Sequence, residues 1–181
     1  MDKRQPPSPE VLRKLLRYDP ETGSLFWRER SAGAFQSERA AKSWNTRYAN
    51  KQAFTALNNY GYFVGNVNYV TCLASRVAWA VTYGEWPNND TDHINGDRTD
   101  NRLCNLRQAT RSENHCNKGP QRNNTSGHKG VSWNKRAGRW EAAIGKDGHV
   151  KFLGRFEVLA DAEAAYRAAA TTIHGEFARL A

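Results

Sequence analysis

A short segment in the middle of the chain constrains the fold more than any other stretch. Residues 91–94 have the composition of a short strand, Asn95-Gly96-Asp97 is a turn sequence, and residues 105–110 indicate a second strand. The sequence over residues 110–113, Thr-Arg-Ser-Glu, has the form of a capping box, which satisfies the free amide donors at the start of a helix. We therefore predict a strand, a turn, a strand and a helix in direct succession, with the helix over residues 111–118.

The whole chain is basic but also apolar enough to fold. It has 181 residues, with 27 Lys and Arg against 18 Asp and Glu, which gives a net charge of +9. Hydrophobic residues make up 39% and aromatic residues 11%, and this composition excludes a disordered basic tail. The length allows one ordinary domain or several small ones. We predict a folded protein that binds a polyanion.

The charge is unevenly distributed along the chain. Residues 1–88 carry 12 Lys/Arg and 7 Asp/Glu (+5), residues 89–117 carry 4 and 5 (−1), and residues 118–181 carry 11 and 6 (+5). Two basic flanks around a slightly acidic middle are expected if the flanks bind phosphates and the middle binds a cation. Chance fluctuation in a short window gives a similar pattern, so charge alone leaves both readings open.

Membrane insertion and export are not expected. No apolar run approaches the ~20 residues that a membrane-spanning helix needs, and residues 1–10 are polar and lack an apolar signal core. The three cysteines, Cys72, Cys104 and Cys116, are odd in number and form no Cys-x-x-Cys pair. We predict reduced, buried thiols in a cytoplasmic protein, with neither disulfides nor a zinc ribbon.

The residues before the central segment predict several short elements. Residues 31–52 are polar and basic with little periodicity, so we predict a long loop that binding to a partner could order. The other predicted elements are a helix over 11–17, a turn over 18–23, a strand over 25–27, a hairpin over 60–69 and a helix over 73–82.

The residues after the central segment predict a second small module. Its second and third strands are joined by Asp147-Gly148, a strong hairpin signal, and its helix is closed by Gly175. In the second strand, Trp140, Ala142 and Ile144 alternate with polar or small residues and form a predicted core face. The third strand has no clean alternation. The predicted elements are a linker over 119–127, strands over 130–134, 139–145 and 149–156, and a helix over 159–174.

The central segment resembles a known nuclease family. Asn105 and Asn114 lie 12 and 21 residues after His93, on the second predicted strand and the predicted helix. With Ile94-Asn95-Gly96-Asp97, Asp100-Asn101-Arg102 and Asn105-Leu106-Arg107, the string resembles phage HNH endonucleases, which have a ββα-metal core. The resemblance implies that His93 is the general base, that Asn105 braces the hairpin, and that Asp92 and Asn114 bind a divalent metal.

The chemistry of phosphodiester hydrolysis needs these residue types. A neutral imidazole can activate water, and a cation can stabilise the charge that builds on the phosphate. Carboxylate and amide oxygens are hard ligands that suit Mg²⁺ or Mn²⁺ and not zinc. Taken singly, each of these residues is more often part of a turn than of a catalytic site.

The C-terminal module resembles the Apetala-2 (ethylene response factor type) DNA-binding domain. The resemblance rests on residues 129–133, 139–144, 152–156 and 164–169. It implies that one face of the sheet lies in the major groove while the other packs on the helix. Trp133 and Phe152 are either core or contact residues, and a merely solvated face is the alternative for the charged side chains. The implied DNA contacts are Lys129, Asn134, Lys135, Arg136, Arg139, Lys151 and Arg155.

These observations predict an α+β protein with a small ββα-metal (HNH, His-Me finger) core and a three-stranded antiparallel sheet packed on one helix. The predicted parts are a basic region over 1–58, a nuclease domain over 59–118 with its core at 90–118, a linker over 119–127 and a DNA-binding domain over 128–181. We expect a phage homing-type endonuclease that acts on double-stranded DNA with Mg²⁺ or Mn²⁺ in the infected host, as a monomer. One alternative is a non-catalytic, sequence-specific DNA-binding protein whose nuclease motif is degenerate. A third possibility is an RNA binder, but the sequence has no exposed aromatic pairs in an RRM or KH pattern.

Overall fold

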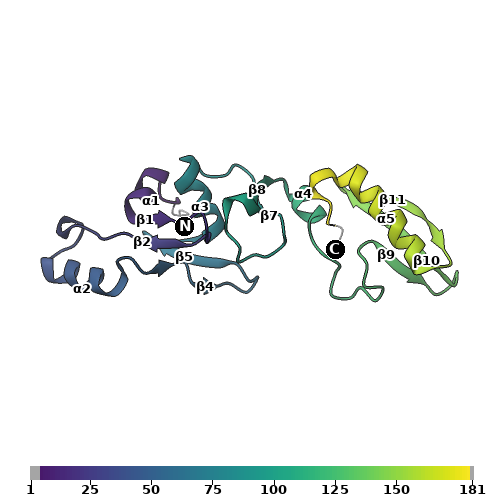
Figure 1. The fold of residues 1–181 in the computed structure, drawn as a ribbon, viewed down its shortest axis with the longest axis horizontal. Helices are drawn as coiled ribbons and strands as arrows, with labels where there is room; N and C mark the ends of the chain where they lie inside the picture. Colours follow the sequence, from purple (N-terminus) through teal and green to yellow (C-terminus); the bar gives the residue numbers. More distant parts are fainter. Residues whose placement is uncertain (1–4, 180–181) are drawn as a thin grey trace. The chain divides into compact units, whose positions relative to one another are not determined.

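The computed structural model describes residues 5–179 (Figure 1). They divide into two compact units, the first ending at Gln108 and the second beginning at Ala109. Short helices and several small antiparallel sheets make the chain a mixed α+β protein. Each unit has its own cluster of buried hydrophobic side chains. The two units are described separately below.

Within residues 5–108, the first unit contains two small three-stranded sheets and three α-helices. The first sheet has the order β1 (Leu16–Tyr18), β2 (Leu25–Trp27), β3 (Gln52–Ala53). The second has the order β4 (Ala56–Leu57), β5 (Phe63–Val67), β6 (Val70–Leu73). The helical elements are α1 (Pro9–Leu15), the 3-10 helix η1 (Ala32–Ala34), α2 (Glu38–Tyr48) and α3 (Ala74–Tyr83).

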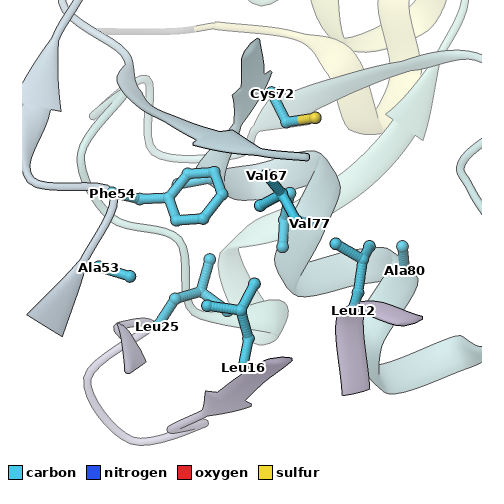
Figure 2. Close-up of a cluster of buried hydrophobic side chains, with 10 residues drawn as sticks. Leu12, Leu16, Leu25, Ala53, Phe54, Val67, Cys72, Val77 and Ala80 are labelled. Atoms are coloured by element: carbon cyan, nitrogen blue, oxygen red, sulfur yellow. The ribbon is translucent and has the colours of Figure 1, made fainter. Parts of the chain in front are cut away.

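Figure 2 shows the hydrophobic core of the first unit. Leu12 comes from α1, Leu16 and Leu25 from the first sheet, Val67 from β5 and Val77 from α3, and all five are at most 1% exposed. Complete burial of each such side chain contributes roughly 1.5–3 kcal/mol. This core joins α1, α3 and both sheets, and α3 leads directly toward the segment of the candidate site.

Most predicted elements of the first unit are confirmed, with small shifts in their ends. The predicted helix over 11–17 is α1, which ends at Leu15 because the next residues continue as β1. The hairpin is formed by β5 and β6, and its turn residues Asn68 and Tyr69 have φ values of 50° and 64°. The second predicted helix is α3, which ends at Gly84 in the left-handed conformation.

The prediction of a long loop over residues 31–52 is wrong. Ser37 accepts a hydrogen bond from the Ala40 amide (3.2 Å) and so caps the start of α2. The Trp44 ring lies 5.9 Å from the rings of Trp27 and Phe35, centroid to centroid. This aromatic packing gives the polar helix α2 its hydrophobic anchor.

The second unit contains a three-stranded sheet packed on a long helix, as predicted. Its sheet order is β11-β10-β9, and Ala142 and Ile144 of β10 lie buried against Tyr166 and Ala170 of the helix. The β10–β11 turn at Asp147 has φ 52°, which is the left-handed backbone that a two-residue hairpin requires. The elements are α4 (Arg111–Cys116), β9 (Val131–Asn134), β10 (Arg139–Lys146), β11 (His149–Phe156), α5 (Leu159–His174) and η3 (Gly175–Phe177).

All three cysteines are free thiols, but they differ in exposure. Cys72 and Cys116 are buried as predicted, and burial raises the pKa of both thiols. Cys104 is exposed, so the prediction that it is buried is wrong. It lies in the short 3-10 turn η2 (Leu103–Asn105), which turns its side chain to the surface. None of the helices within residues 5–179 has the length and apolar character to cross a membrane.

Candidate active site

The candidate site is built on a two-stranded sheet formed by β7 (Asp90–His93) and β8 (Leu106–Ala109). Arg76 of α3 fixes the approach to β7, because its guanidinium donates to the carbonyls of Pro87 (2.9 Å) and Asn89 (2.8 Å). The last three residues of β7, through His93, are buried. The predicted pair of strands is thus present, and β7 carries its polar side chains into the protein.

Asn105 ties together the loop between the two strands. Its Nδ2 donates to Asn95 Oδ1 (3.0 Å) and to the Asp100 carbonyl (2.9 Å), and its Oδ1 accepts from the Asn95 amide (2.9 Å). Its backbone carbonyl also accepts from the Ile94 amide at 2.9 Å. A side chain that is 7% exposed therefore uses both ends of its amide to fix the loop that follows His93.

His93 is buried and held by a second asparagine. The side chain is 3% exposed, its Nε2 lies 3.1 Å from Asn101 Oδ1, and its ring lies 5.7 Å from the Tyr62 ring, centroid to centroid. Asn101 Nδ2 donates to the Thr99 carbonyl (3.4 Å), which directs Oδ1 toward the histidine. Because an amide oxygen only accepts hydrogen bonds, a hydrogen bond at this contact requires the His93 tautomer that has its proton on Nε2.

Burial sets the protonation of His93. Desolvation lowers its pKa below the ordinary imidazole value, while the Asn101 hydrogen bond and the nearby Asp92 act in the opposite direction. The neutral ring is therefore favoured at neutral pH. A neutral imidazole with a fixed tautomer is the form that can accept a proton.

Asn101 is itself positioned from the N-terminal part of the chain. The Tyr18 hydroxyl donates to the Asn101 carbonyl (2.9 Å) and accepts from the Leu103 amide (3.1 Å), and burial raises the Tyr18 pKa to about 12. A Cβ on Gly23 would lie 2.5 Å from the Arg102 amide nitrogen, so only glycine allows the turn after β1 to approach this closely. Neither Asn101 nor Tyr18 was predicted as a site residue.

Asp92 is paired with an arginine on the neighbouring strand. Its Oδ2 accepts from Nε and Nη2 of Arg107, both at 2.9 Å, and the two side chains are 5% and 12% exposed. Arg107 had no predicted role, although it lies in one of the quoted motifs. The pairing places a guanidinium beside the Asp92 carboxylate within a buried sheet.

The predicted helix after β8 is α4, and its capping box is confirmed. Thr110 Oγ1 accepts from the Glu113 amide (3.3 Å), and Glu113 Oε2 accepts from the Thr110 amide (2.8 Å). Asn114 lies on α4 as a half-buried residue, and its neighbour His115 is exposed. Asn114 belongs to the second unit, while Asp92, His93 and Asn105 belong to the first.

The donors present are of the kind that a hard divalent cation accepts. Asp92 offers a carboxylate oxygen in the first unit and Asn114 an amide oxygen in the second. Both are ligand types that suit Mg²⁺, an ion that keeps several of its waters. Among residues 5–179, no group of three or more His, Cys, Asp or Glu is arranged to hold a metal. Asp100 is bound at both oxygens by Arg102 (2.7 and 2.6 Å), and this contact lowers the Asp100 pKa to about 2.

The register of the second unit assigns the faces of its sheet. Asn134 pairs with Arg139, and Glu141 pairs with Ser132 and Arg155, so these residues share the outer face. Glu141 Oε1 accepts from Asn134 Nδ2 and from Arg155 Nε, both at 2.8 Å. Phe152 pairs with Ala143 and is 56% exposed on the same face.

The other predicted DNA contacts fall in three places. Lys135 and Arg136 are exposed in the β9–β10 turn. Lys129 is half-buried, and its Nζ donates to the carbonyls of His115 (3.3 Å) and Cys116 (2.5 Å) at the end of α4. Lys151 pairs with the buried Ile144 and so does not share the outer face with Arg155. The structure thus groups Asn134, Arg139 and Arg155 but gives Lys129 and Lys151 different surroundings.

Comparison with known proteins assigns the site to a family. A family model described as HNH endonuclease matches residues 72–116, which run from β6 through α4. The chain therefore contains an HNH endonuclease domain over these residues. Protein 3.8 of Escherichia phage T7 is 35% identical over 89 residues, which cover 49% of this chain and 73% of that protein. No solved structure matches the chain significantly.

Proposed function

We propose that this protein is a metal-dependent DNA endonuclease of the phage homing type, with His93 as its general base. The observation that supports this most is the geometry of His93, a buried imidazole whose Nε2 is committed to Asn101. Nδ1 can then take a proton from the attacking water, while the fixed Nε2–H keeps the ring from turning. The substrate in this proposal is double-stranded DNA in the cytoplasm of a phage-infected host.

Asp92 and Asn114 are the residues that would hold the metal, Mg²⁺ or Mn²⁺. When bound, such an ion supplies positive charge that stabilises the phosphate and the leaving oxygen. Asp92 brings a carboxylate whose orientation is fixed by Arg107, and Asn114 brings an amide oxygen from α4. Asn105 acts by holding the loop that follows the base. We include in the proposal that β7, β8 and α4 form a ββα-metal core.

Site selection belongs, in this proposal, to residues 128–181 as a DNA-binding module of the Apetala-2 type. The module exposes Arg139 and Arg155 on the outer face of its sheet, and Lys135 and Arg136 in the adjoining turn. Arginine suits phosphate and guanine because its planar fork donates two parallel hydrogen bonds. Lys129 caps α4 and Lys151 lies apart from this face, so the proposed interface excludes both.

The second candidate function is a non-catalytic DNA-binding protein. The Asp92–Arg107 ion pair favours it, because a guanidinium already neutralises the carboxylate that is the proposed metal ligand. The two functions predict different outcomes when the protein is mixed with DNA. The alternative predicts DNA binding without any phosphodiester cleavage.

Incubation of the full chain with supercoiled plasmid and Mg²⁺ separates the two functions. The proposed nuclease converts the plasmid to nicked or linear DNA, and EDTA stops the reaction. The ratio of nicked to linear product also tells whether one strand or both are cut. Binding to the plasmid with no cleavage in Mg²⁺ or Mn²⁺ would favour the alternative, and cleavage in EDTA would remove the metal from the proposal.

A further inference from the structure

The outer side of α2 lies outside the site described above. Between Arg28 and Lys51, the chain carries six Lys or Arg against two Asp or Glu. Five polar residues of α2 recur at helical spacing and so line one side of the helix. All five are exposed. We call this set the α2 stripe, and it consists of Arg39, Lys42, Ser43, Thr46 and Arg47.

The opposite side of α2 is firmly held. The Asn45 side chain forms two hydrogen bonds to the backbone of Arg30, from Nδ2 to the carbonyl (2.8 Å) and from the amide to Oδ1 (3.0 Å). Trp44, its neighbour, packs edge-on against Trp27. These contacts fix the rotation of α2 about its axis, so the stripe is presented outward by a rigid support.

The cations of the stripe differ from the neighbouring Arg30 in their exposure and in their partners. The Arg30 guanidinium lies 4.1 Å from the Trp44 ring and 5.3 Å from the Trp27 ring, and burial lowers its pKa, so this charge serves the packing of α2. Across residues 5–179, no ion pair involves Arg39, Lys42 or Arg47. The three stripe cations are therefore available for an external anion.

We propose that the α2 stripe binds the phosphate backbone of duplex DNA, as a contact additional to the β9–β11 module. This inference rests on the proposed function as a DNA endonuclease. Arg39 and Arg47 are eight residues apart, or about 12 Å along the helix axis. That distance matches the axial rise of roughly three to four base pairs. In Figure 1, α2 lies beyond β2 and away from β7, so the stripe extends the contact beyond the cleavage site.

The residue types of the stripe favour backbone contact over base reading. Guanidinium, ammonium and hydroxyl groups are the usual donors to phosphate oxygens, and such contacts position a protein without reading sequence. The stripe contains no aromatic side chain, whereas proteins that bind single strands stack bases on aromatic rings. The expected ligand is therefore duplex DNA of any sequence.

The test compares two variants of the full chain that each lose two positive charges. Arg39→Gln/Arg47→Gln removes the ends of the stripe, and Lys14→Gln/Arg17→Gln removes two exposed cations from α1 and β1 of the same unit. Binding to two duplexes of unrelated sequence is measured in EDTA over a range of salt concentrations. The stripe variant should lose affinity about equally for both duplexes, with a log–log salt slope shallower by about two, because each phosphate contact contributes ~0.9. The control variant should keep the wild-type slope.

Three results would overturn the proposal. If the stripe variant has the wild-type salt slope, α2 does not contact the DNA backbone. The proposed nuclease function still stands in that case, provided that the wild-type protein binds DNA in the same assay. A loss confined to one duplex means base reading instead. Failure of the wild type to bind either duplex removes the stripe proposal and the proposed function together. If the double variant melts at a lower temperature, Lys42→Gln replaces it, with an expected change in slope of about one.

Discussion

His93 at the end of β7 and Asn101 in the following loop are buried and bonded to each other, whereas the polar side chains on the outer face of the β9–β11 sheet are more exposed. His93 and Asn101 are 3% and 4% exposed, while the side chains of Arg139 and Arg155 are 48% and 56% exposed. Both regions are rich in hydrogen bonds. They differ in whether water can replace a partner that is lost.

This difference suits the two regions to different tasks: buried polar groups hold one another in position, and exposed ones can bind an external partner. A buried polar group that loses its partner cannot recover it from water, so its geometry is strongly constrained. Exposed ion pairs such as Arg139–Glu157 (2.8 Å) contribute only about 0–1 kcal/mol and can exchange one anion for another. Substitutions in the loop should therefore change the cleavage rate, and substitutions on the sheet face should change DNA affinity.

Apart from His93→Ala, the largest effect is expected at Asp92. Asp92→Asn and Arg107→Gln both break the same ion pair, but only the first removes the carboxylate charge proposed to bind the metal. Cleavage by Asp92→Asn should fall on the order of 10³-fold, since metal charge stabilisation is worth several kcal/mol and each ~1.4 kcal/mol is tenfold. Arg107→Gln should lower the melting temperature but keep the wild-type Mg²⁺ concentration for half-maximal cleavage. Equal Mg²⁺ requirements in the two variants would remove Asp92 from the metal site.

Asn101→Ala should lower the cleavage rate by about 10²-fold without weakening DNA binding. The substitution removes the acceptor that fixes the His93 ring, and misplacement of a catalytic group by about 1 Å has effects of this size. Asn66→Ala, in the β5–β6 hairpin, is the matched control and should cleave at the wild-type rate. Single-turnover cleavage at saturating protein measures the effect. A normal rate in Asn101→Ala would show that His93 needs no such support.

Trp140→Ala should act through stability. Trp140 packs against the core of the second unit and lies 5.0 Å from the Trp133 ring, centroid to centroid. Because Trp140 is only partly buried, we expect a loss of roughly 3 kcal/mol, the lower end for a large aromatic side chain. Chemical denaturation followed by tryptophan fluorescence measures this loss. An unchanged unfolding midpoint with weakened DNA binding would reverse the assignment of faces.

The smallest effect is expected next to it, at Arg139. Arg139→Ala should lower DNA affinity and make the log–log salt slope shallower by about one if the guanidinium contacts a phosphate. Glu157→Gln removes the partner of Arg139 and should leave affinity equal or higher. Salt titrations of both variants decide the matter. A loss of affinity in Glu157→Gln, or none in Arg139→Ala, would place the DNA elsewhere.

Local signals predicted the second unit well. The β10 alternation, the Asp147-Gly148 turn and the apolar spacing of α5 each depend on residues close in sequence, and all three are present. α2 was missed because what stabilises it comes from outside the helix. Trp44 packs on Trp27, and Asn45 holds the backbone of Arg30. The polar composition of residues 31–52 does not reveal these contacts.

The candidate site was predicted only in part for the same reason. His93 and Asn105 follow from the family resemblance, but Asn101 is held by Tyr18, whose contact spans more than eighty residues of sequence. α4 was predicted within the nuclease core, and the family model includes it, but the packing of Cys116 with Ala109 and Phe177 was not predicted. Sequence spacing placed the helix correctly but could not show its packing.

Cleavage rate and DNA affinity measured together for His93→Ala test the central claim most directly. His115→Ala is the matched control, because His115 is an exposed histidine on α4. The claim predicts that His93→Ala lowers the single-turnover rate on plasmid by roughly 10²- to 10⁴-fold, with an affinity in EDTA equal to wild type. His115→Ala should match the wild type in both. Equal cleavage by His93→Ala and wild type would contradict the claim that His93, at the end of β7, is the catalytic base.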